Sequence, residues 1–136
     1  MNERGLSEML SGIIVTHGKL ADALRDAAAN IAGDASHLDI VSNDDLSPDE
    51  LLASVRAAVE RAGEDGVIVF TDLGGGSCAT ACLRVLRDHP NVRLVTGINL
   101  PMLVDFVLRR GDHDLDALVA RLLQRGQSSI QELRGA

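Results

Sequence analysis

Residues 66–72, Gly-Val-Ile-Val-Phe-Thr-Asp, form the segment that most constrains the fold of this chain. Its apolar side chains occupy both alternations, whereas a strand with one solvated face would alternate apolar and polar residues. Burial on both faces is typical of a parallel sheet that is covered by helices on two sides. The segment therefore predicts a central strand of a parallel sheet.

Three weaker strand patterns and five helical patterns accompany this strand. Strands are predicted over residues 12–17, 37–42 and 92–99, and helices over residues 20–33, 47–63, 101–111 and 112–126. Residues 74–90 are predicted to form a glycine turn that leads into a further helix, which ends before Pro90. Alternating strands and helices imply right-handed crossovers. We therefore predict an α/β fold with a doubly wound, four-stranded parallel sheet in the order 2-1-3-4 and helices on both faces. No linker or repeat interrupts residues 1–136, which are predicted to form one domain.

Spacing within the helical patterns predicts which sides are buried. In the first helix, Leu20, Leu24 and Ile31 fall on one apolar face together with several alanines. The second helix opens with Ser47, Pro48 and Glu50, which predict a capping box with proline in the first helical position. Gly126 is expected to end the last helix.

Composition argues against nucleic-acid binding and against insertion into a membrane. The net charge is −7 and only Phe70 and Phe106 are aromatic, so neither a basic surface nor stacking side chains are available for nucleic acid. No stretch approaches the roughly 20 apolar residues that span a bilayer, and the first ten residues are polar. We expect a cytoplasmic protein without membrane insertion. Cys78 and Cys82 are expected to be small core residues, and no metal site is predicted.

The candidate site lies where two neighbouring strands end. Ligands of open α/β sheets bind beyond the carboxyl ends of the strands, where the strand order reverses, here between the first and third strands. The first strand ends in Thr16-His17-Gly18, and the third ends in Thr71-Asp72 before a glycine-rich helix entrance. His17, Asp72 and this entrance are therefore predicted to meet in one crevice.

These residues suit phosphoryl transfer. Asp72 can accept a hydrogen bond from one ring nitrogen of His17, which leaves the other nitrogen free as a nucleophile. Backbone N–H groups at a helix start, with a nearby hydroxyl, can cradle an anion. The predicted phosphate site comprises Gly18, Gly74, Gly75, Gly76 and Ser77. A nucleophilic imidazole beside such a cradle is what a phosphohistidine intermediate requires.

Other interpretations fit less well. Residues 74–79 satisfy the dinucleotide pattern G-x-G-x-x-A, but they follow the third strand, and no suitably placed acidic residue ends the next one. No Walker A sequence is present, so ATP is not implied, and no cofactor is predicted. A receiver-like switch phosphorylated on Asp72 would need an acidic cluster after the first strand, where this chain has His17.

Three segments together resemble the mannose-family IIA component of the bacterial phosphoenolpyruvate-dependent sugar phosphotransferase system. They are residues 12–24 (GIIVTHGKLADAL), 67–81 (VIVFTDLGGGSCATA) and 97–108 (GINLPMLVDFVL). The family often has tryptophan where this chain has Gly74, and proline where it has Cys78. These departures keep His17 and Asp72 but alter the rim around them.

The resemblance implies a phosphotransferase that relays a phosphoryl group in sugar uptake. His17 would accept the group on Nε2 from the phosphohistidine carrier HPr and pass it to a separate IIB component, while Asp72 holds Nδ1. Asn99, Pro101 and Met102 would contribute to partner docking. The resemblance also allows peripheral association with a membrane permease complex. The same chemistry would serve a regulatory phosphoprotein of an incomplete system, or the phosphotransfer subunit of a dihydroxyacetone kinase.

The resemblance also implies a homodimer. In that family the C-terminal segment can supply an antiparallel edge strand to the partner subunit, which in this chain would be residues 128–133. The helix propensity of Gln131, Glu132 and Leu133 equally allows this segment to extend the last helix. The sequence names no sugar, because a IIA domain touches only other proteins.

Overall fold

A computed structural model of the chain describes residues 9–135. Strands and helices alternate along it as predicted. The strands are β1 (Ser11–Thr16), β2 (Leu38–Ser42), β3 (Val67–Thr71) and β4 (Val92–Thr96), and the helices are α1 (Leu20–Ala32), α2 (Pro48–Ala62), α3 (Gly76–Leu86), α4 (Leu100–Arg109) and α5 (Leu115–Ser128).

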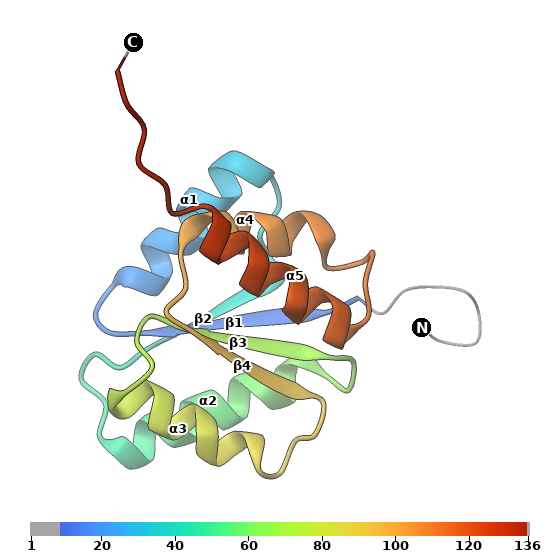
Figure 1. Cartoon of the computed structure of the whole chain (residues 1–136). Helices are drawn as coiled ribbons and strands as arrows, with labels where there is room; N and C mark the ends of the chain where they lie inside the picture. Colours follow the sequence, from blue (N-terminus) through green and yellow to red (C-terminus); the bar gives the residue numbers. More distant parts are fainter. Residues whose placement is uncertain (1–8, 136) are drawn as a thin grey trace.

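The four strands form one parallel sheet in the predicted order β2-β1-β3-β4 (Figure 1). Every residue of β3 is buried, which confirms the central strand inferred from its apolar run. The more polar β2 and β4 lie at the two edges. Helices α1, α4 and α5 cover one face of the sheet, and α2 and α3 cover the other (Figure 1).

The sheet separates two apolar cores. The core beneath α2 and α3 is wholly aliphatic apart from the two cysteines, whereas the opposite core holds both aromatic residues. Phe70 of β3 and Phe106 of α4 meet edge to face there, with ring centroids 5.4 Å apart. Helix α2 begins as predicted: the hydroxyl of Ser47 accepts from the N–H of Glu50, whose carboxylate accepts from the N–H of Ser47.

The predicted buried face of α1 is wrong at both ends. Leu20 and Ile31 are 42% and 63% exposed, while Ala21 and Ala28 are buried and Leu24 is half-buried. An alanine-rich helix carries more than one apolar stripe, so spacing alone does not choose between them. Packing against β1 and α4 selects the stripe of small side chains, which lets the helices approach closely.

Helix α5 also departs from the prediction, because it continues through Gly126 to Ser128. A Cβ on Gly126 would lie 2.7 Å from Cε of Met102, and the Gly126 carbonyl accepts from Nδ2 of Asn99 at 3.0 Å. The glycine therefore allows α5 to pack closely on α4 instead of ending the helix. Residues 130–135 form neither helix nor strand and lead away from the sheet (Figure 1), so the helical extension is wrong beyond Ser128.

The two cysteines are buried free thiols on α3, as predicted. Burial raises the pKa of Cys82 to about 12. Burial, and then the nearby Asp72 charge, also raise the pKa of Cys78.

The reactivity of the two cysteines tests this packing. Because thiolates are the reactive form, we expect neither Cys78 nor Cys82 to react with a disulfide reagent at pH 8 in the native protein. Both thiols should react once the chain is denatured. A native thiol that titrates rapidly would contradict this packing.

Candidate active site

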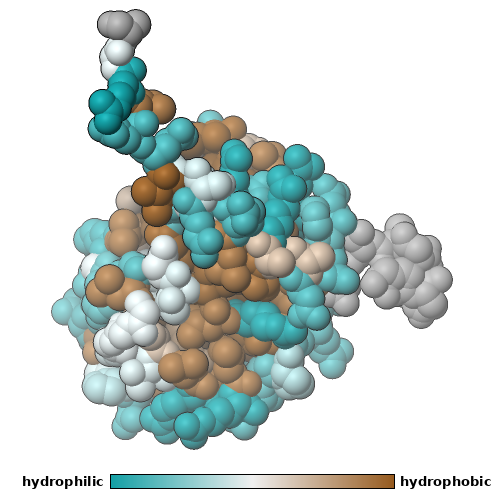
Figure 2. All heavy atoms as spheres, viewed as in Figure 1, coloured by the Kyte–Doolittle hydropathy of each residue, from teal (hydrophilic) through white to brown (hydrophobic). Residues whose placement is uncertain are grey.

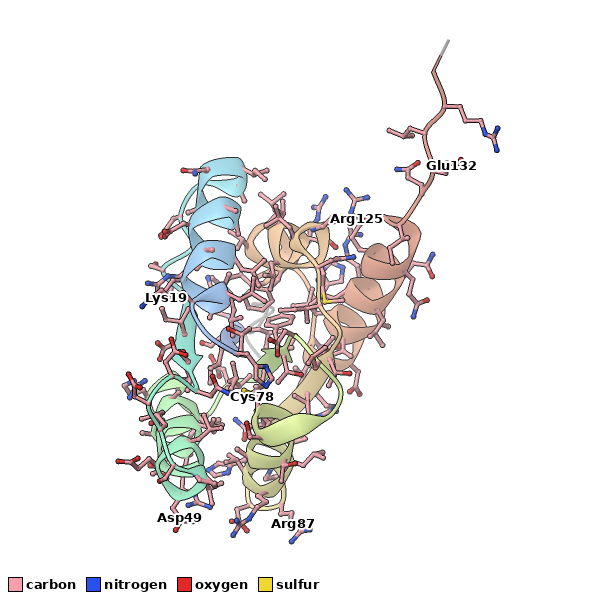
Figure 3. All side chains as sticks on the ribbon, turned by 90° about the vertical axis from the view of Figure 1, so that its left-hand side faces the viewer. Lys19, Asp49, Cys78, Arg87, Arg125 and Glu132 are labelled. Carbon is pink, nitrogen blue, oxygen red and sulfur yellow. The ribbon has the colours of Figure 1, made fainter. Side chains whose placement is uncertain are left out.

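His17 and Asp72 meet beyond the ends of β1 and β3. Nδ1 of His17 lies 2.9 Å from Oδ2 and 3.2 Å from Oδ1 of Asp72, and the backbone N–H of His17 donates to Oδ2 at 3.1 Å. Figure 3 looks onto this edge of the sheet, with Lys19 labelled at the start of α1 and Cys78 in the first turn of α3. The contact predicted across 55 residues is therefore present.

Local sequence explains how the histidine is presented. Gly18 has φ +59°, in the left-handed region that glycine adopts without strain, and it turns the chain between β1 and α1. The hydroxyl of buried Thr16 accepts from the N–H of Ala21 at 2.8 Å and so ties the first turn of α1 to the strand end. The register that pairs Val15 with Thr71 sets Asp72 beside the turn.

Asp72 is a charged acceptor. Burial raises its pKa, but hydrogen bonds from the ring and backbone of His17 and from the N–H of Leu73 outweigh burial, so the pKa lies below its usual value. A carboxylate only accepts hydrogen bonds, so Nδ1 of His17 carries the proton and Nε2 keeps a free lone pair. The His17 side chain is 40% exposed and Asp72 only 14%, so the imidazole is accessible while its hydrogen-bond partner is sheltered.

The free nitrogen faces the start of α3. A Cβ built on Gly76 would lie 3.7 Å from Nε2 of His17, and Gly76 has φ +87°, where a side chain would be strained. Gly74 lies against Thr96 at the end of β4, while nothing lies within 4 Å of the Cβ position of Gly75. Among Gly74, Gly75 and Gly76, only Gly76 has a Cβ position within 4 Å of the histidine ring. Exposed Ser77 follows it in the first turn of α3.

Helix α3 begins without a capping side chain. Helices α2, α4 and α5 each have one, supplied by Ser47, Asn99 and Asp114. The N-cap residues of α1 and α3, Lys19 and Gly75, make no side-chain cap hydrogen bond. The first N–H groups of a helix have no partner within it, and its dipole favours negative charge there. In α1 the N–H of Ala21 already donates to the Thr16 hydroxyl, so α3 is the helix beside His17 whose N-terminus remains available to an anion.

The residues predicted to dock a partner lie at the start of α4, at the same end of the sheet. Asn99 caps α4 by accepting from the N–H of Met102 at 3.2 Å, and it bridges to Gly126 of α5. Met102 is buried against α5, whereas Pro101 is half-buried. Packing of α4 on α5 therefore occupies the Met102 side chain and leaves it little surface to offer a partner.

Two further residues at this edge did not emerge from the sequence. The hydroxyl of Ser42 donates to the Gly18 carbonyl at 2.5 Å, and Oδ1 of Asn43 accepts from the Gly18 N–H at 3.2 Å. Both follow from the register, which pairs Thr16 with Ser42. The sequence feature that could have identified them is a pair of adjacent polar residues at the carboxyl end of β2, the strand next to β1.

Residues 9–135 contain no group of three or more His, Cys, Asp or Glu side chains arranged to bind a metal ion. Within the same residues, no helix combines the length and the apolar character needed to cross a membrane.

Comparison with known proteins places this geometry in a family. The family model for the PTS system fructose IIA component, EIIA-man, matches residues 11–123. The chain is 28% identical over 128 residues to the PTS system mannose-specific EIIAB component of Escherichia coli, covering 90% of this chain but only 39% of that protein. It is 26% identical over 103 residues to the PTS system sorbose-specific EIIA component of Klebsiella pneumoniae, covering 73% of each.

Solved structures of phosphotransferase-system IIA components have the same fold as this chain. The mannose/sorbose specific IIA subunit of the phosphotransferase system from Enterococcus faecalis has a TM-score of 0.84 and 26% identity, covering 93% of this chain and 96% of that one. The phosphotransferase system component EIIA from Streptococcus agalactiae has a TM-score of 0.80 and 25% identity, covering 91% and 97%. Since the family match spans most of the sequence and the fold agrees throughout, this chain belongs to the mannose-family IIA components of the phosphotransferase system.

Proposed function

We propose that residues 1–136 act as one cytoplasmic IIA-type phosphocarrier domain in sugar uptake, associating peripherally with a membrane permease complex. His17 accepts a phosphoryl group from HPr and passes it to a histidine of a IIB component. The observation that carries this proposal is the 2.9 Å contact between Nδ1 of His17 and Asp72. It leaves Nε2 as an exposed nucleophile that faces the start of α3.

The transfer step follows from these positions. The Nε2 lone pair attacks the phosphorus of phosphorylated HPr, the P–N bond to the HPr ring breaks, and that ring nitrogen recovers the electron pair. Nδ1 of His17 keeps its proton, so the phosphorylated ring becomes cationic and the Asp72 carboxylate stabilises it. The phosphoryl oxygens are received at the proposed phosphate site, Gly18, Gly74, Gly75, Gly76 and Ser77. Transfer to IIB reverses the same step.

Incubation with phosphoenolpyruvate, enzyme I and HPr tests this function. We expect one phosphoryl group per chain, acid-labile and base-stable as a phosphoramidate is, and assigned by mass spectrometry to a peptide containing His17. No uptake would contradict the proposal, and so would an acyl phosphate on Asp72.

We also propose a homodimer in which the tail of each copy completes the sheet of the other. Strand β4 is an edge strand, and unpaired edges are normally covered or paired. Figure 2 shows hydrophobic residues gathered across the face on which β4 lies, below α5. In the tail, Ile130 is 80% exposed and Leu133 is similarly open, while Glu132 stands clear of the helices (Figure 3). A second copy would cover these side chains as an antiparallel fifth strand.

Removing the tail should separate the subunits. Because α5 reaches Ser128, a chain that ends at Ser129 keeps the whole helix and its packing on α4. We expect this shortened chain to be monomeric in light scattering, with helical circular dichroism per residue close to that of the full chain. In the full chain, Ile130→Asp should weaken the dimer and Gln131→Asp, which adds the same charge at a polar position, much less. A shortened chain that stays fully dimeric would exclude the tail from the interface.

A further inference from the structure

The turn that carries His17 belongs to no regular element. Strand β1 ends at Thr16 and α1 begins at Leu20, and the N–H of Leu20 reaches the His17 carbonyl only at 3.5 Å. Gly18 adopts φ +59° in the middle of this turn. The orientation of the imidazole therefore depends on contacts that come from outside the turn.

One side of the turn is held by Asp72, and the other side by the last residue of β2, Ser42, and by Asn43, which follows it. Asn43 makes two of the contacts on that side: its N–H donates to the Thr16 carbonyl at 3.2 Å and its Oδ1 accepts from the Gly18 N–H at 3.2 Å. Ser42 makes the third, from its hydroxyl to the Gly18 carbonyl. Both peptide groups of Gly18 are thus bound by side chains of adjacent residues.

We propose that Ser42 and Asn43 are positioning residues for phosphoryl transfer at His17. Asp72 receives both the ring Nδ1–H and the backbone N–H of His17, so any rotation of the turn about Gly18 disturbs both hydrogen bonds. By binding Gly18 on the far side, the Ser42–Asn43 pair keeps the ring proton directed at Asp72. Nε2 then stays directed at Gly76. This role rests on the proposed phosphocarrier function.

A purely structural role would be loop closure, since the Ser42 hydroxyl also accepts from the N–H of Asp44 at 3.1 Å. Ser47→Ala is a matched control for that possibility. It removes a hydrogen bond to Glu50 from the same connection between β2 and α2, but Ser47 makes no hydrogen bond to the turn. A change that follows from loop stability alone would appear in this control as well.

Two readouts test the proposal in the full chain. The first is the rate of phosphoryl uptake from phosphorylated HPr, which we expect to fall about three- to tenfold in Asn43→Ala and Ser42→Ala, the range that loss of one net hydrogen bond gives. The second is the ¹⁵N NMR spectrum of the His17 ring in the unphosphorylated protein. The wild type should show a single tautomer protonated on Nδ1, and both variants a mixture.

Ser42→Thr keeps the hydroxyl and should restore both readouts, while Ser47→Ala should leave both at the wild-type values. The proposal is overturned if Asn43→Ala and Ser42→Ala keep the wild-type rate and a single tautomer, or if Ser47→Ala shifts the tautomer equally. A wild-type chain that takes up no phosphoryl group refutes the phosphocarrier function instead, and the tautomer measurement alone then decides whether Ser42 and Asn43 position the ring.

Discussion

His17→Ala should abolish phosphoryl uptake from HPr completely, rather than reduce it. The other three histidines are His37, His89 and His113, and each precedes β2, β4 or α5 at the opposite end of the parallel sheet. Nδ1 of His89 contacts a backbone carbonyl at 2.9 Å, whereas Nδ1 of His17 contacts a carboxylate. In the part of the chain that the structure describes, none of these three histidines has both a carboxylate partner and a neighbouring helix N-terminus in the arrangement found around His17. We therefore expect none of them to accept the phosphoryl group.

The measurement is the amount of acid-labile phosphate per chain after incubation with phosphoenolpyruvate, enzyme I and HPr. His37→Ala is the matched control, because it removes an exposed imidazole of the same chemistry from the other end of the sheet. This control should reach one phosphoryl group per chain at the wild-type rate. Stoichiometric label in His17→Ala would show that another residue is the acceptor.

Asp72→Asn should slow phosphoryl transfer roughly ten- to a hundredfold, because a hydrogen bond to a charged group contributes about 1.5–3 kcal/mol. The amide keeps the size of the carboxylate but loses the charge that stabilises the cationic phosphorylated ring. An amide can also present its own N–H₂ to Nδ1, which favours the tautomer protonated on Nε2 and blocks the nucleophile. Single-turnover transfer from phosphorylated HPr measures the loss.

The pH dependence of stability gives an independent check on Asp72. The native-state pKa of this carboxyl lies below its usual value of 3.8, so its hydrogen bonds stabilise the native state fully above that value. This stabilisation is lost as the pH falls through the lowered native pKa. The difference in melting temperature between wild type and Asp72→Asn should therefore shrink as the pH falls below about 4. In the transfer experiment, an equal rate of phosphoryl transfer in wild type and Asp72→Asn would remove Asp72 from the mechanism.

The sequence by itself determined the sheet and the residue pair at the carboxyl ends of its two central strands. The run that contains Val67–Thr71 is apolar on both alternations, and only a strand buried on two faces favours that pattern. Parallel strands bring their carboxyl ends to one edge, so residues that follow the first and third strands become neighbours once the strand order is known. His17 and Asp72 were predictable for this reason, although 55 positions separate them.

Tertiary packing decided which face of α1 is buried and where α5 ends, because the local sequence pattern allows more than one answer to each question. The alanine-rich α1 offers several apolar stripes, and packing against the sheet and α4 buries Ala21 and Ala28 while Ile31 stays exposed. Gly126 looks like a helix end in sequence, yet its missing side chain makes room for Met102, a contact between two helices. The residue type limits the conformations and the burial that are open to a position. The neighbouring residues in the folded structure determine which of these occurs.

The Ser42–Asn43 pair shows that local pattern is equally ambiguous at the candidate active site. Serine and asparagine after a strand are ordinary turn residues, and nothing local distinguishes a loop that closes itself from one that holds a neighbouring turn. The pairing of Thr16 with Ser42 across β1 and β2 sets these side chains against Gly18. Which hydrogen bonds form depends on register between strands distant in sequence, because a backbone group binds whichever partner the packed sheet brings within reach.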